Sequence, residues 1–154
     1  MLKNIFDSHS HYDDDAFDSD RFELLSKELK SGGVCAVIDA GSSLEKSRVA
    51  AELSRQYDMV YAAVGIHPEE CDDIPDDYID EIRLLAKKSE KIVAIGEIGL
   101  DYHYEGYDKA KQFAVFEKQL ILARELDLPV IIHSRDATGD MMEFLRKYRP
   151  RGVM

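Results

Sequence analysis

The chain has 154 residues, of which 45% are apolar and 33% charged, and its formal net charge is −11. This mixture predicts a soluble globular protein, and the negative charge argues against charge-driven binding to nucleic acid or acidic membranes. The net charge does not exclude a phosphate-bearing substrate, because bound divalent cations can reverse the sign of the electrostatic field at a site inside an acidic protein. The acidic segments 13–20 and 69–77 are expected to be solvated surface.

The N-terminus has no signal-peptide pattern, and no apolar run approaches the roughly 20 residues that span a bilayer. The two cysteines form no disulfide framework, which fits a cytoplasmic location. Cys35 lies in an apolar run and is expected to be buried, whereas Cys71 is given no role.

Short apolar runs alternate with amphipathic helical patterns. In chain order the pattern predicts strand 4–8, helix 20–31, strand 34–40, helix 42–57, strand 59–65, helix 76–89, strand 92–97, helix 108–127, strand 129–133 and helix 137–148. The strands are nearly continuous apolar runs, which is typical of a parallel sheet covered by helices. Ser42 and Glu45 have the spacing of a capping box, so the second helix is expected to begin at Ser42.

These elements make five β-α units, and 150–154 resemble the opening of a sixth strand. A closed (β/α)₈ barrel of the TIM type typically needs ~250 residues. We therefore expect 1–154 to be a single domain, the N-terminal part of an incomplete TIM-type barrel, with an open five-unit sheet as the alternative. An uncovered barrel edge also predicts self-association.

Two histidines follow the first predicted strand. His9 and His11 are two residues apart, and in an extended chain such side chains point to the same face. The active site of this architecture lies at the carboxyl ends of the strands, so both imidazoles can reach one metal ion there. The alternative is a pair of surface histidines, or buried ones satisfied by hydrogen bonds, and the spacing favours the ligand role.

A carboxylate and a third histidine end two later strands. Glu97 follows the run IVAIG, and a buried carboxylate is costly unless it is paired or binds metal. Gly96 and Gly99 allow close approach of the backbone. Glu97 is therefore predicted to bind metal and His133 to bind a second ion, and a carboxylate can also bridge two ions, the usual arrangement for cleaving phosphate esters. The alternative for Glu97 is a salt bridge inside the barrel mouth, and the alternative for His133 is a histidine packed in the core.

Five further residues near strand ends are candidates for binding substrate or orienting the ligands: Asp7, His67, Asp101, Tyr102 and Arg135. His67 could contact substrate or stiffen its loop together with Pro68. Arg135 could bind a phosphate through two hydrogen bonds, or form an ion pair with Asp136 or a helix carboxylate. His103 is given no role.

Four motifs together resemble the TatD family of metal-dependent hydrolases, within the wider amidohydrolase-like TIM barrels. They are DSHSH at 7–11, GIHP at 65–68, GEIGLDYH at 96–103 and IIHSRDA at 131–137. The resemblance runs over the whole chain, which looks like the first three-fifths of a family member. It implies a (β/α)₈ barrel with divalent cations and deoxyribonuclease activity, often from 3′ ends.

Carried over by motif, the resemblance implies that His9 and His11 bind one metal, Glu97 bridges and His133 binds the second. The family also uses a histidine after strand six and an aspartate at the end of strand eight, both expected beyond Met154. That aspartate is the usual candidate for orienting the attacking water, so no general base is assigned within the chain.

The sequence therefore predicts a TatD-type hydrolase that cleaves phosphodiester bonds in DNA with a metal-activated water. The alternatives are hydrolysis of a small amide or ester, and a metal-binding fragment without catalysis. One or two divalent ions are expected. The ligands suit Zn, Mn, Fe or Ni, and Mg is less natural with several imidazoles.

Overall fold

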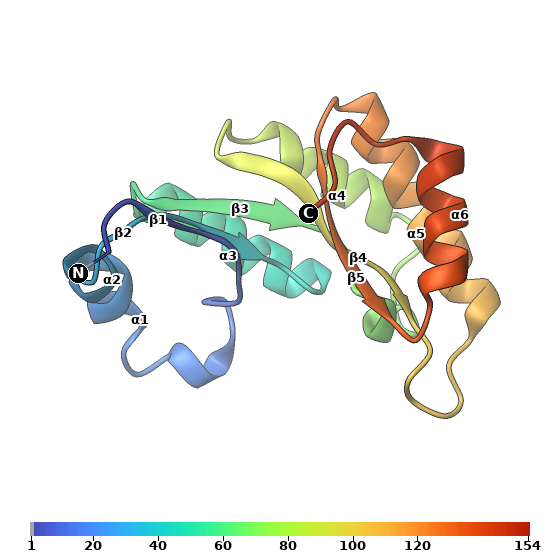
Figure 1. The fold of residues 1–154 in the computed structure, drawn as a ribbon, viewed down its shortest axis with the longest axis horizontal. Coiled ribbons are helices and arrows are strands. Elements are labelled where there is room, and N and C mark those ends of the chain that lie inside the picture. The colour runs from blue at the N-terminus through green and yellow to red at the C-terminus, as the bar shows by residue number, and fades with distance from the viewer. Residues whose placement is uncertain (1) are drawn as a thin grey trace.

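A curved parallel sheet organises the structure, a computed structural model that describes residues 2–154 (Figure 1). Its five strands follow one another in the order of the chain. They are β1 (Ile5–Ser10), β2 (Val34–Ala40), β3 (Val60–Val64), β4 (Ile92–Asp101) and β5 (Val130–Arg135). Every neighbouring pair is parallel, with a helix in each connection, which confirms the incomplete TIM-type barrel.

The helices lie close to their predicted positions. They are α1 (Arg21–Glu23), η2 (Leu24–Glu28), α2 (Leu29–Ser31), α3 (Leu44–Gln56), α4 (Tyr78–Lys87), α5 (Lys109–Glu125) and α6 (Thr138–Tyr148), with short turns η1 (Asp15–Phe17) and η3 (Pro68–Glu70). The first predicted helix is thus continuous but has a π-helical centre. The expected cap at Ser42 is wrong, because it is the Ser43 side chain that accepts the amide hydrogen of Lys46.

Three strands extend beyond the predicted apolar runs. β4 continues to Asp101 and β5 to Arg135, because the two strands stay paired where their sequences turn polar: Gly99 lies opposite His133, and Asp101 opposite Arg135. β1 likewise reaches Ser10. The candidate site residues therefore lie on or directly beside a rigid sheet.

The opening of a sixth strand is confirmed beside β5. Val153 forms a parallel bridge with Val130. The Val130 amide donates to Gly152 O at 2.9 Å, and the Met154 amide donates to Val130 O at 2.9 Å. The sheet thus continues past β5 in the same parallel sense.

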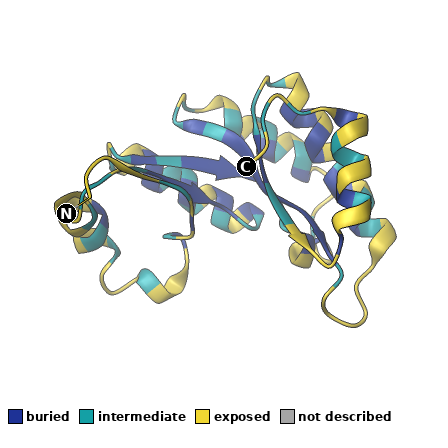
Figure 2. Ribbon diagram, in the orientation of Figure 1, coloured by how far each residue is buried: buried dark blue, intermediate teal, exposed yellow. Residues whose placement is uncertain are grey.

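Most of the sheet is buried, and the exposed residues gather on the helices and loops around it (Figure 2). Helices α3 to α6 cover one face, where residues such as Ala50, Ile82 and Phe116 pack with the strands in the main core. The opposite, concave face is an apolar hollow of about 530 Å³ whose lining includes Phe6, Ile38, Tyr61, Val93, Ile131 and Val153. No helix within residues 2–154 is both long and apolar enough to cross a membrane.

The expectation for Cys35 is wrong: its side chain is exposed, and Cys71 is the buried cysteine. Cys35 lies near the start of β2, next to the edge strand β1, where its thiol donates to the carbonyl oxygen of Ile5 at 3.3 Å. Cys71 packs into the main core beside η3.

Candidate metal centre

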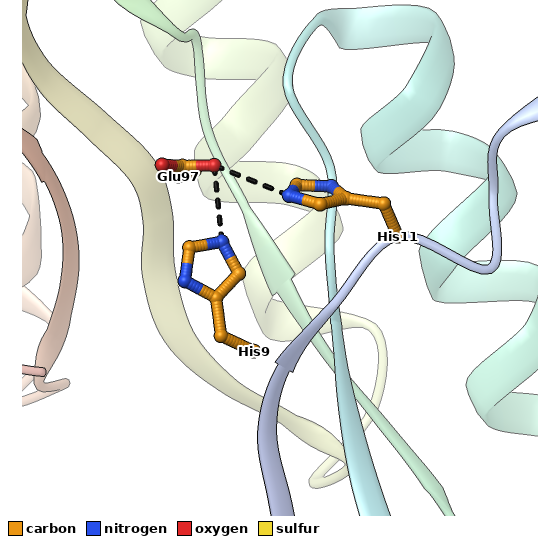
Figure 3. A group of neighbouring side chains, drawn as sticks. All are labelled: His9, His11 and Glu97. Atoms are coloured by element: carbon orange, nitrogen blue, oxygen red, sulfur yellow. Dashed lines mark hydrogen bonds and ion pairs between the residues drawn. The ribbon is translucent and has the colours of Figure 1, made fainter.

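His9 and His11 meet Glu97 although 88 residues separate His9 from Glu97 in the chain. Their side chains leave the end of β1 and the turn after it, and both point toward β4 (Figure 3). His9 Nε2 lies 3.1 Å and His11 Nε2 3.3 Å from the same oxygen, Oε2 of Glu97. One imidazole pair therefore faces one carboxylate oxygen.

The other oxygen of Glu97 faces a different histidine. His133, on β5, places Nδ1 3.2 Å from Oε1 of Glu97 and Nε2 2.7 Å from Oδ2 of Asp101. The His67 ring packs against that of His133, with centroids 4.1 Å apart. Candidate ligand atoms lie within 4.8 Å of one another in two groups that share Glu97: one with His9 and His11, the other with His67 and His133.

Two glycines bring β4 and β5 together at this point, as the sequence predicted. A Cβ on Gly99, whose φ is +155°, would lie 1.9 Å from the carbonyl oxygen of His133. A Cβ on Gly96 would lie 2.6 Å from the Cβ of Ile131. Side chains at these positions would push the strands apart, so the glycines allow Glu97 to approach His133.

The buried carboxylate is held in its charged form by the surrounding imidazoles. Burial alone would raise the pKa of Glu97, which is 7% exposed, but hydrogen bonds with His11, His133 and His9 outweigh burial and lower it. The same hydrogen bonds to Glu97 raise the pKa of His11 and of His133. An ionised carboxylate among imidazoles is a donor set suited to a divalent transition metal.

His67 is placed to donate a hydrogen bond. Its Nδ1 accepts the amide hydrogen of Glu69 at 3.2 Å. Burial, and then the neighbouring His133, lower the pKa of His67 to about 4, so the ring is neutral at pH 7. A neutral imidazole that accepts at Nδ1 carries its proton on Nε2. His67 thus stiffens its loop through Nδ1 and offers the Nε2 proton as a hydrogen-bond donor beside Glu97 and His133.

The remaining predicted residues lie around the cluster, but not all make the expected contacts. Asp101 contacts His133, as a residue that orients a ligand would. Asp7 instead accepts the backbone amide of His9 at 3.2 Å. Tyr102 instead donates to Asp140 at 2.7 Å and stacks on the Tyr107 ring, with centroids 4.9 Å apart.

Arg135 does not pair with Asp136. Its guanidinium lies over the Tyr104 ring and donates to the Tyr104 hydroxyl at 3.3 Å, while Asp136 contacts His103 at 3.2 Å. Tyr104 was given no role from the sequence. Its only local signal is that an aromatic residue follows the GEIGLDYH motif directly.

Asp39 was also missed. It is the penultimate residue of β2, is completely buried and accepts the Tyr12 amide hydrogen at 2.5 Å, which fixes the chain directly after His11. Burial raises the pKa of Asp39 to about 7. The sequence held the signal, because a carboxylate within the run VCAVIDA is as costly to bury as Glu97.

Comparison with known proteins gives the relatives of the chain. Residues 6–154 match the family described as "TatD related DNase". The metal-dependent hydrolase YabD of Bacillus subtilis, named as uncharacterised, is 38% identical over 93% of this chain and 55% of its own length. The 3′-5′ ssDNA/RNA exonuclease TatD of Cronobacter sakazakii is 35% identical over 92% of this chain and 53% of its own length.

A solved structure agrees with these sequences. The crystal structure of YJJV, a TatD homologue of Escherichia coli, superposes with a TM-score of 0.87 at 30% identity, covering 94% of this chain and 56% of that one. The chain therefore spans about half the length of the relatives it matches. Because the family match includes nearly every residue, the chain belongs to the family of TatD-related DNases.

Proposed function

We propose that residues 1–154 are the N-terminal part of one (β/α)₈ barrel domain that hydrolyses phosphodiester bonds in DNA. The observation that carries the proposal is that the two carboxylate oxygens of Glu97 face different histidines. One oxygen faces His9 and His11, and the other faces His133. A carboxylate so placed can bridge two cations, the arrangement used for phosphate ester cleavage. Among the relatives, the Schizosaccharomyces pombe protein is named deoxyribonuclease Tat-D, at 36% identity.

We propose His9, His11, Glu97 and His133 as ligands of one or two divalent ions. Nε2 of the first two imidazoles and Nδ1 of His133 already face the carboxylate. Asp101 can accept the Nε2 proton of His133, which leaves Nδ1 free to coordinate. Bound cations would lower the pKa of a water molecule and stabilise charge on phosphorus. Zn, Mn, Fe and Ni suit this donor set better than Mg.

Two residues are proposed to contact the substrate phosphate. His67, neutral and protonated on Nε2, can donate to a phosphoryl oxygen. Arg135 lies two residues beyond His133 on β5, and side chains two apart in a strand share a face. Its guanidinium supplies positive charge where the other groups are carboxylates and imidazoles. No residue within 2–154 is assigned as general base.

The test is metal-dependent release of nucleotides from a 3′-labelled single-stranded DNA, after treatment with chelator and addition of one metal at a time. His9→Ala should abolish the release, and His103→Ala should leave metal binding unchanged, since His103 lies in neither ligand group. Hydrolysis of small amides or esters without cleavage of DNA would instead identify the alternative substrate class. Metal binding without turnover of any substrate would indicate a fragment that is catalytically incomplete.

We further propose that the chain self-associates through the open edge of its barrel. The supporting observations are the exposure of Phe6, which is 53% accessible on the edge strand β1, and the apolar lining of the hollow beside it. Exposed apolar patches beside an unpaired strand edge favour association. The cytoplasmic location stays a prediction, which fractionation of cells would check.

A further inference from the structure

Two buried glutamines on α5 hold the backbone beside the ends of two strands. Gln119 is fully buried, and Gln112 is 4% exposed. Gln119 Oε1 accepts the Ile66 amide hydrogen at 2.8 Å, and its Nε2 donates to the Ile66 carbonyl oxygen at 3.0 Å. Gln112 Oε1 accepts the Asp101 amide hydrogen at 2.9 Å, and its Nε2 donates to the Asp101 carbonyl oxygen at 2.8 Å. Each glutamine therefore satisfies both polar groups of one backbone residue.

The two residues held in this way lie past the last pairing between β3 and β4. That pairing ends where Val64 lies opposite Ile95. Ile66 follows the end of β3, and Asp101 is the last residue of β4. A buried backbone group without a hydrogen-bond partner costs free energy. The side chains of α5 thus supply the hydrogen bonds that a neighbouring strand supplies elsewhere in the sheet.

Both residues also adjoin the side chains that contact His133. Ile66 directly precedes His67, whose ring packs against that of His133 with centroids 4.1 Å apart. Asp101 Oδ2 lies 2.7 Å from Nε2 of His133. The two glutamines are seven residues apart on one helix, a spacing that places them on the same face. One face of α5 therefore fixes both neighbours of His133.

We propose that Gln112 and Gln119 are positioning residues of the metal centre, which hold Asp101 and His67 in contact with His133. The inference rests on the proposed metal ligands and adds two residues outside that ligand set. Asp101 must stay fixed to accept the Nε2 proton of His133, because this hydrogen bond orients the ring and leaves Nδ1 for the ion. A role in stability alone would leave the geometry of His133 unchanged when either glutamine is replaced.

The experiment replaces each glutamine by a residue of similar length that cannot form the two hydrogen bonds. Gln112→Met and Gln119→Met are compared with Leu122→Ala, a buried residue of the same helix that is 1% exposed. Leu122→Ala lowers stability by leaving a cavity, and it removes no hydrogen bond to Ile66 or Asp101. Circular dichroism confirms folding. Asn at either position keeps the amide one methylene short of its partner and replaces a Met variant that does not fold.

The first measurement is made on the metal-free chain. Nuclear Overhauser contacts should join the His133 ring to the His67 ring and to the Asp101 side chain in wild type and in Leu122→Ala. Gln119→Met should lose the contact with His67, and Gln112→Met the contact with Asp101. A glutamine whose replacement leaves its contact intact has no positioning role, and the inference is overturned if both contacts persist.

The second measurement is a titration with Co²⁺, whose visible absorption bands report the geometry of the ligands. Each glutamine variant should bind Co²⁺ about tenfold more weakly and with altered bands, whereas Leu122→Ala should match wild type. An equal loss of affinity in Leu122→Ala, or wild-type affinity and bands in both glutamine variants, would overturn the positioning role. A wild type that binds no Co²⁺ would overturn the proposed ligands, and the metal-free contacts would still decide the role of the glutamines.

Discussion

Replacement of Glu97 by Gln tests the centre most directly. The substitution keeps the shape of the side chain and removes the charge that faces His9 and His11 through one oxygen and His133 through the other. Both groups of candidate ligands thereby lose their shared carboxylate. We expect Glu97→Gln to weaken binding of divalent metal at every site the chain offers.

The magnitude follows from the position of Glu97. Loss of a residue that only orients a ligand typically lowers metal affinity about 10- to 100-fold. Glu97 contacts three imidazoles at 3.1 to 3.3 Å and is proposed as a direct ligand. The expected loss is therefore at least about 100-fold.

Isothermal titration calorimetry with Zn²⁺ and with Mn²⁺ measures this loss. Glu90→Gln is the matched control, because Glu90 is exposed just before the other end of the same strand and its loss changes the net charge equally. In the metal-free protein, NMR titration should show lower pKa values for His11 and His133 in Glu97→Gln, since the hydrogen bond to Glu97 raises both. Wild-type metal affinity in Glu97→Gln would refute the bridging role.

Three further predictions concern stability and assembly. Gly99→Ala should lower the free energy of unfolding by about 3 kcal/mol or more in urea titration, because the new Cβ overlaps the His133 carbonyl, whereas Gly139→Ala, with open space around it, should not destabilise the fold. Because burial raises the pKa of Asp39 from 3.8 to about 7, its ionisation opposes folding. Metal-free wild type should thus lose about 4 kcal/mol more stability than Asp39→Asn as pH rises from roughly 4 to 7, and parallel pH profiles would contradict this. Phe6→Glu should shift sedimentation of a concentrated sample toward the monomer, and a wild type that is monomeric at all concentrations would exclude self-association through the open barrel edge.

The sequence by itself determined the order and type of the elements. Apolar runs of strand length alternate with helical periodicity over the whole chain, and both patterns are local, so they could be recognised without any long-range contact. The grouping of polar residues at the strand ends followed from the architecture, because the carboxyl ends of parallel strands meet at one edge. His9, His11, Glu97 and His133 could be selected on that basis.

Tertiary structure alone decided which atoms meet. No local pattern shows that the two oxygens of Glu97 face different histidines, or that Arg135 lies over Tyr104 instead of pairing with Asp136. These contacts join different strands and loops, and their geometry depends on how the strands curve and pair. Pairing with β5 also carried β4 four residues past its predicted apolar run, from Glu97 to Asp101, because backbone hydrogen bonds continue where hydrophobicity ends.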